Sequence, residues 1–199
     1  MSRPDVEIAG IVVGQAALNR TLPALRPDDL AEPSGLPGWT RAHVLAHIAR
    51  NADSVVHRLQ GAIDNLVVDQ YDGGTVGRAA EIEQTATMPL DELVAYVRDS
   101  SAEVEKLCAA VPDDAWGRLS RAHWGGEVPA AAVVYSRWQE VEIHHVDLAM
   151  GYRAGDWPEP FAQHMLPKLL AELPDRADAR PLVAWLTDRQ MPPRLRAWG

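Results

Sequence analysis

The chain has 199 residues, with 19 basic and 28 acidic side chains and a formal charge of −9 at pH 7. A chain of this length can bury one substantial core, so we expect a single domain with a small appendage. The acidic balance argues against nucleic acid as the partner, because proteins that bind nucleic acid usually carry a basic patch. A small-molecule ligand is favoured.

The first residues and the apolar stretches show no targeting or membrane pattern. No apolar run approaches the roughly 18 to 20 residues that a membrane helix needs. Residues 8–18 are interrupted by glycine and glutamine, which is not typical of a secretion signal. We therefore predict a soluble, cytoplasmic protein with no membrane partner, either a monomer or a homodimer.

The chain contains one cysteine, Cys108. An intramolecular disulfide and every cysteine-based zinc cluster are thereby excluded. Any bound metal must use histidine and carboxylate ligands.

The first half of the sequence predicts two long helices. Apolar residues at intervals of three and four predict a helix over 6–25, which two prolines close. Residues 32–38 contain two prolines and two glycines and predict a loop. Thr40 is a good N-cap for a second helix over 41–63.

The middle of the sequence predicts a loop and a third long helix. Residues 69–77 contain three glycines and predict a loop, followed by a short helical turn over 78–84. Pro89 opens the third helix, which runs toward Val111 and has two acidic residues in its first turn, where they suit the helix dipole.

The last part predicts a fourth long helix and a tail. Residues 116–128 predict a short extended segment with a turn at Gly125 and Gly126. A helix over 130–150 follows, and Gly151 stops it. Four long helices with these connections predict a mainly all-α bundle. Two shorter helical candidates follow, over 161–173 and 181–188.

A metal-ligand pattern lies in the fourth predicted helix. Glu140 and His144 are four residues apart and share one helical face, which is how bundles build metal sites. His47, in the middle of the second helix, supplies a third point. Two imidazoles and one carboxylate leave a fourth position open, which is the catalytic pattern for zinc, although iron or nickel also suits such a set.

Spacing alone leaves other interpretations open. A Glu and a His four apart are commonly a surface pair, and His43 together with His47 is a competing choice of ligands. Glu142 and His145 turn away from Glu140 by about 200 and 140 degrees. We expect both to be solvated or to support the ligands from outside.

Two segments resemble the mycothiol-dependent maleylpyruvate isomerases of the DinB-like superfamily. They are LPGWTRAHVLAHIARNAD at 36–53 and RWQEVEIHHVDL at 137–148. The resemblance covers roughly residues 6–152 and implies an antiparallel four-helix bundle that holds zinc. The family's zinc ligands fall on His47, Glu140 and His144.

The resemblance also implies roles for two arginines. Arg78 and Arg189 stand where family members have active-site arginines, which bind carboxylates of substrate or thiol cofactor through paired hydrogen bonds; each can equally be a solvated surface residue. Asp147 is expected to orient a ligand or to form an ion pair at the helix end. Three tryptophans either line the pocket or pack in the core: Trp39, Trp124 and Trp138.

The tail departs from the family pattern, in which a second small domain contains strands. We expect a DinB-like bundle over 1–152 and a short, mostly helical extension over 153–199. The resemblance implies a metal-dependent, mycothiol-using isomerase or S-transferase that acts on a small electrophile. A metal-dependent hydrolase and a non-catalytic metal-binding protein remain alternatives.

Overall fold

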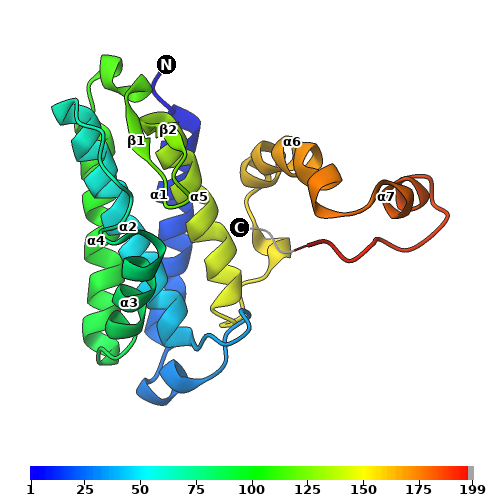
Figure 1. Ribbon diagram of the computed structural model, residues 1–199. Coiled ribbons are helices and arrows are strands. Elements are labelled where there is room, and N and C mark those ends of the chain that lie inside the picture. The colour runs from blue at the N-terminus through cyan, green and yellow to red at the C-terminus, as the bar shows by residue number, and fades with distance from the viewer. Residues whose placement is uncertain (197–199) are drawn as a thin grey trace. The chain divides into compact units, whose positions relative to one another are not determined.

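The structure is a computed structural model that describes residues 1–196 (Figure 1). The long helices are α1 (Asp5–Thr21), α2 (Arg41–Asp64), α4 (Leu90–Ala110) and α5 (Ala130–Asp147). The shorter helices are α3 (Gly74–Thr85), α6 (Glu159–Arg176) and α7 (Ala179–Leu186), and the strands are β1 (Leu119–Arg121) and β2 (Glu127–Pro129). Short 3-10 turns occupy Leu22–Ala24, Pro27–Ala31, Asp113–Gly117 and Ala154–Asp156. The prediction of a mainly all-α four-helix bundle is confirmed.

The four long helices pack as a ring in which two run in each direction. Leu93 and Val97, early in α4, share an apolar cluster with Val44 and Ile48, early in α2, so these two helices run parallel. Arg137 of α5 donates to the carbonyl of Ile48, while residues later in α5 meet earlier residues of α2. Helices α2 and α5 are therefore antiparallel, as Figure 1 shows.

Two glycines bring α1 close to α5. A Cβ on Gly10 would lie 2.2 Å from the ring of Trp138, and one on Gly14 would lie 2.7 Å from Oε1 of Glu142. The glycines therefore let the two helices approach without a clash.

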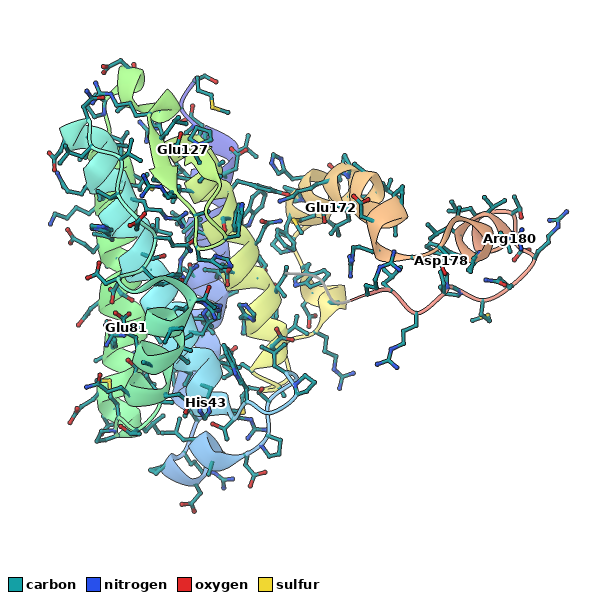
Figure 2. All side chains as sticks on the ribbon, viewed as in Figure 1. His43, Glu81, Glu127, Glu172, Asp178 and Arg180 are labelled. Atoms are coloured by element: carbon teal, nitrogen blue, oxygen red, sulfur yellow. The ribbon has the colours of Figure 1, made fainter. Side chains whose placement is uncertain are left out.

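Helix α2 begins after Thr40, as the sequence predicts. The Thr40 backbone N–H donates to Nδ1 of His43 at 3.3 Å, and the Thr40 hydroxyl lies 2.7 Å from the same nitrogen. His43 is thereby occupied in capping the helix. Figure 2 shows it at the end of the bundle opposite Glu127 of the hairpin.

The predicted loop over 69–77 is wrong in its second half, because α3 already begins at Gly74. The chain reverses at Gly73 and Gly74, whose φ angles are 70° and 61°. A Cβ on Gly77 would lie 1.8 Å from the carbonyl oxygen of Asp72. Glycines that usually interrupt a helix here permit a tight entry into one.

The predicted extended segment forms an antiparallel hairpin in which Ser120 pairs with Val128. Gly125, at φ 89°, lies in its turn. Strand β1 packs against α2 and β2 packs against α5. Strand β1 is also held to the α2–α3 loop, because Gln70 N–H donates to the carbonyl of Arg121.

The chain divides after Asp156 into two compact units. The predicted boundary at residue 152 lies close to this division. In the second unit, Trp157 packs edge-on against Phe161 with ring centroids 5.5 Å apart, and α6 and α7 contact each other. No strand follows Gly151 in the described part of the chain, as predicted. Residues 197–199 of the predicted extension lie outside the described residues.

Within residues 1–196, no helix combines the length and the apolar character that crossing a bilayer requires.

Candidate metal centre

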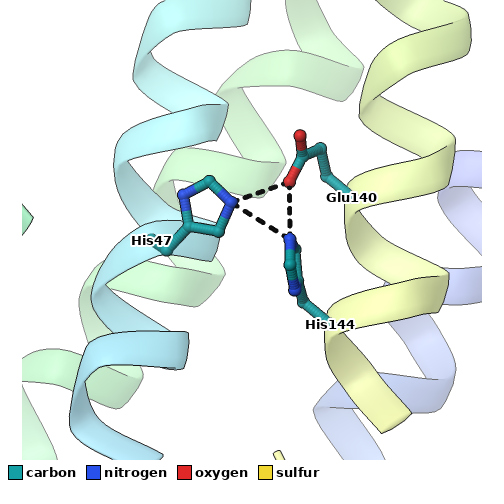
Figure 3. Close-up of side chains that lie close together, drawn as sticks. All are labelled: His47, Glu140 and His144. Carbon is teal, nitrogen blue, oxygen red and sulfur yellow. Dashed lines mark hydrogen bonds and ion pairs between the residues drawn. The ribbon is translucent and has the colours of Figure 1, made fainter. Parts of the chain in front are cut away.

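Three side chains meet between α2 and α5 (Figure 3). His47 Nε2 lies 2.8 Å from Glu140 Oε2 and 3.2 Å from His144 Nε2. Glu140 Oε2 and His144 Nε2 are 3.0 Å apart. Glu140 and His144 are one helical turn apart and therefore share a face of α5. The antiparallel packing of α2 places His47 opposite them.

These three residues fit a metal ion. Around a tetrahedral ion with bonds of about 2.0 to 2.1 Å, ligand atoms lie about 3.3 Å apart. The three ligating atoms lie within 4.8 Å of one another, so small outward movements would accommodate an ion. The described residues add no fourth His, Cys, Asp or Glu to this group. A fourth coordination position is therefore available for another ligand.

Burial and mutual contact shift the pKa values of the group. Burial acts to raise the pKa of Glu140, but His47 and His144 hold it well below its usual value. Burial lowers the pKa of His47 despite the neighbouring carboxylate. Burial acts the same way on His144, yet hydrogen bonds to Asp147 and Glu140 outweigh it and raise its pKa to about 9. Without metal the site holds a protonated His144, and a metal ion must displace that proton.

The Nδ1 atoms of His47 and His144, which point away from the three-residue group, have different partners. Asp147 Oδ2 lies 2.8 Å from His144 Nδ1, which is the usual arrangement for a carboxylate behind a metal-binding histidine. Arg78 Nη2 lies 3.2 Å from His47 Nδ1. An arginine can only donate, so Nδ1 accepts and the ring proton of His47 lies on Nε2, which faces Glu140.

The two predicted arginines lie in different units. Arg78, on α3, reaches the metal centre, and its guanidinium lies over the ring of Tyr71 at 5.9 Å from the centroid. Arg189 belongs to the second unit, where it donates to the carbonyl of Thr187. Its role at the site stays a prediction.

His43, the competing ligand, lies outside the group of three candidate ligands, as do Glu142 and His145. His43 caps α2 and lies 3.3 Å from Glu83 of α3, away from the other two ligands. The expectation that Glu142 and His145 are solvated is wrong, because both are buried. The packing of α1 on this face of α5 covers them.

Glu142 and His145 form a second polar cluster at the α1–α5 contact. Tyr152 donates to Glu142 Oε2 at 2.8 Å, and its ring stacks on that of His145 with centroids 3.8 Å apart. His145 Nε2 lies 2.7 Å from the hydroxyl of Thr21. Burial raises the pKa of Glu142 and lowers that of His145 to about 4.

The three tryptophans divide between the candidate metal centre, the core and the surface. Trp39 meets the edge of His47 with ring centroids 5.5 Å apart. Trp138 is buried against Gly10 in the α1–α5 contact. Trp124, in the hairpin turn, is 68% exposed.

Sequence reasoning missed two buried arginines beside the site. Arg137 is fully buried and donates to the Ile48 carbonyl and to Asn51 Oδ1. Arg58 is 3% exposed and donates from Nε to the Ser54 carbonyl at 3.3 Å. Both lie on the helical faces that carry the candidate metal ligands, and this spacing is the signal that would have found them.

Two histidines and a carboxylate between α2 and α5 of a four-helix bundle are what the resemblance to the DinB-like superfamily implies. The model of the mycothiol maleylpyruvate isomerase N-terminal domain matches residues 13–149. The chain belongs to this family.

Solved structures agree with this assignment. A mycothiol-dependent maleylpyruvate isomerase is 27% identical at a TM-score of 0.78, with 83% of this chain and 69% of that chain covered. A histidine-to-alanine mutant of such an isomerase is 26% identical at a TM-score of 0.80, with 87% and 72% covered. YfiT from Bacillus subtilis, a probable metal-dependent hydrolase with an unusual four-helix bundle topology, is 17% identical at a TM-score of 0.57, with 73% and 82% covered, and shows the fold alone. Among curated proteins no sequence match was found.

Proposed function

We propose that this protein is a metal-dependent enzyme that uses mycothiol or a related low-molecular-weight thiol to act on a small electrophile. Its reaction is the cis–trans isomerisation of a maleylpyruvate-like compound or the transfer of the thiol to the electrophile. The observation that carries the proposal is the convergence of His47, Glu140 and His144 on one point. Membership of the family supports the choice of thiol and substrate. Cytoplasmic location belongs to the same proposal.

The proposed metal is zinc or another divalent ion, which would act as a Lewis acid and lower the pKa of the thiol. His47, Glu140 and His144 would hold it, and Asp147 would keep His144 in the correct orientation. The bundle itself supplies the rigid frame, because all three ligands project from long packed helices.

Arg78 would bind a carboxylate of the electrophile. When His47 is a ligand through Nε2, its remaining proton resides on Nδ1, so Arg78 loses the acceptor it has in this structure. Its guanidinium then becomes free for paired hydrogen bonds to a carboxylate close to the reacting atoms.

The reaction needs no change of oxidation state. The thiolate sulfur adds to one carbon of a conjugated double bond, and the pair of π electrons moves toward the carbonyl of the electrophile. Rotation about the resulting single bond and expulsion of the same thiolate give the trans isomer. In a transferase the adduct takes up a proton at carbon and leaves with the sulfur attached.

A hydrolase would need a general base beside the metal-bound water. Glu142, the other carboxylate in this part of α5, lies on the opposite face of the helix and accepts from Tyr152. This placement favours the thiol-dependent reaction over hydrolysis. A metal-binding role without catalysis is disfavoured for another reason, because it has no use for an open coordination position.

The test is metal analysis of the purified protein, followed by turnover of maleylpyruvate with and without mycothiol. We expect about one divalent ion per chain and turnover only with the thiol. Metal content without thiol-dependent turnover of either kind would contradict the proposal and leave the non-catalytic or hydrolytic role. Protein stripped with a chelator and reloaded with zinc is the control.

A further inference from the structure

His123 lies in the turn of the β1–β2 hairpin, where one side-chain oxygen holds it. Its backbone N–H donates to Gln70 Oε1 at 3.0 Å, and its Nδ1 lies 3.2 Å from the same oxygen. Gln70 is itself fixed, because it is 8% exposed and its N–H donates to the Arg121 carbonyl at 2.9 Å. The α2–α3 loop therefore holds the imidazole ring of His123 in place.

These contacts determine where the ring proton of His123 lies. A backbone N–H can only donate, so the Gln70 atom that it meets is the amide oxygen and not the amide nitrogen. That oxygen can only accept, so Nδ1 of His123 donates to it and carries the ring proton. The other nitrogen, Nε2, keeps its lone pair. Among the described residues nothing hydrogen-bonds to Nε2, and His123 is exposed.

The hairpin brings His123 close to the charged residues of the metal centre. Strand β1 packs against α2 and β2 packs against α5, and the turn between them points toward the middle of α5, as Figure 1 shows. Arg78 and Glu140 both act electrostatically on His123. Glu140 is a candidate ligand, and Arg78 donates to His47. A basic nitrogen without a protein partner thus lies at the edge of the metal centre.

The charges around His123 keep it neutral at pH 7. Partial burial and the guanidinium groups of Arg78 and Arg58 lower its pKa below 6.5, and Glu140 opposes them only in part. Beside the turn, Arg121 is paired with Asp69. The uncharged ring can therefore accept a proton at neutral pH.

The other basic groups near the metal centre are occupied or face away. The three candidate ligands would bind the ion, and Asp147 is hydrogen-bonded to His144. Glu142 and His145 lie at the α1–α5 contact on the opposite face of α5. A thiol must lose its proton to become the nucleophile. His123 Nε2 is a base at this edge of the site that has no other task in the structure.

We propose that His123 is the proton-transfer residue of this centre and that its Nε2 accepts the proton of the thiol. The inference rests on the proposed function and names the base that it requires. The S–H bond breaks as an N–H bond forms at Nε2, the electron pair stays on sulfur, and His123 becomes an imidazolium. In an isomerisation the proton returns to the departing thiolate, and in a transfer it passes to the carbon of the adduct.

The test mixes mycothiol with cobalt-loaded protein and follows the absorption that a thiolate produces on binding cobalt, so no turnover is needed. In His123→Ala we expect thiolate formation near pH 7 to be about 100-fold slower. The final amplitude should be unchanged, because a base alters the rate and not the equilibrium. Imidazole added to the solution should restore the rate in proportion to its concentration. His57→Ala, an exposed histidine on α2, is the matched control and should react like wild type.

The pH dependence separates proton transfer from a structural role. In wild type the rate should fall as pH drops through the pKa of His123, which lies below 6.5, because the protonated ring cannot accept. In His123→Ala the rate should instead rise with pH up to the pKa of the free thiol, about 8.5, because only thiolate already present in solution reacts. Gln70→Glu should move the wild-type fall to higher pH, since a carboxylate beside Nδ1 stabilises the imidazolium.

The inference and the proposed function can fail separately. A His123→Ala variant that melts lower, binds less cobalt and is not rescued by imidazole would identify His123 as structural and overturn the inference. Thiol-dependent turnover in wild type, together with equally fast thiolate formation in the variant, would remove the His123 inference alone. His123-dependent thiolate formation without thiol-dependent turnover would remove the proposed reaction alone. Turnover that needs His123 but no thiol would assign the base to water and overturn both.

Discussion

His144 holds its proton tightly because two carboxylates contact its ring nitrogens. Glu140 lies 3.0 Å from Nε2 and Asp147 lies 2.8 Å from Nδ1. Its folded-state pKa of about 9 exceeds the ordinary value of 6.5. A raised pKa contributes stability that is fully present below about pH 6.5 and is lost as pH rises through about 9. The metal-free protein should therefore lose on the order of 2 to 3 kcal/mol of stability between pH 7 and pH 10.

The pH prediction is measured as a difference between two forms. Urea unfolding of chelator-treated protein is compared with that of zinc-loaded protein from pH 6 to 10. Groups that titrate in both forms contribute equally to the two free energies of unfolding, so their contributions cancel in the difference. The His144 proton is absent from the zinc-loaded form and therefore remains in the difference. Equal pH dependence of the two forms would show that His144 is not the proton that the metal displaces.

Loss of a ligand should lower the zinc affinity more than loss of the residue that orients the ligand. His144→Ala removes one of three ligands, so we expect zinc affinity to fall by more than the roughly 10- to 100-fold that follows loss of an outer-shell partner. Asp147→Asn should produce that smaller loss. His43→Ala is the control, because His43 caps α2 and should leave the affinity unchanged. Competition with a chromogenic chelator gives the three affinities, and a large loss in His43→Ala would favour the rejected ligand pair.

At the scale of elements, the α1–α5 contact depends on glycine. Alanine is the better helix former by about 1 kcal/mol, yet a Cβ at Gly10 would lie 2.2 Å from the Trp138 ring. We expect Gly10→Ala to destabilise the protein by about 1 to 3 kcal/mol through overpacking. Gly155→Ala, which meets nothing within 4 Å, is the control. The midpoint of urea unfolding is measured for both variants. An unchanged midpoint in Gly10→Ala would show that α1 can move away from α5 without loss of stability.

Local patterns predicted the long helices well, because caps and apolar spacing act within a few residues. Thr40 begins α2, and the two glycines near residue 125 form the hairpin turn, as the sequence indicated. The sequence predicted a shorter α3, because residues such as Gly74 and Gly77 disfavour a helix when local sequence alone is considered. Its first turn forms where Gly77 packs against the Asp72 carbonyl, which requires the folded loop.

At the scale of the whole molecule, the second unit carries the other predicted active-site arginine. We expect Arg189→Ala to keep its metal and to raise the KM for an acidic electrophile about tenfold, because only the organic partner would lose a charge-assisted hydrogen bond. Arg180→Ala, on the neighbouring α7, is the matched control (Figure 2). Steady-state kinetics and bound metal per chain are measured together. Arg189 is exposed in the second unit, and an unchanged KM would show that it does not contact the electrophile.

The sequence by itself determined which residues share a helical face. Glu140 and His144 are four apart, so any helix through them presents both on one side. The resemblance to a family then selected His47 over His43 as their partner. Periodicity cannot make that choice, because it describes one helix at a time.

Only the tertiary structure decided which faces are buried and what meets across them. Glu142 and His145 looked solvated along α5, yet the glycines of α1 bring that helix over them. Arg58 is also enclosed, and among the described residues its Nη2 has no hydrogen-bond partner. Burial depends on neighbours that lie far away in the sequence, so local patterns predict the elements of this protein but not the electrostatics of its site.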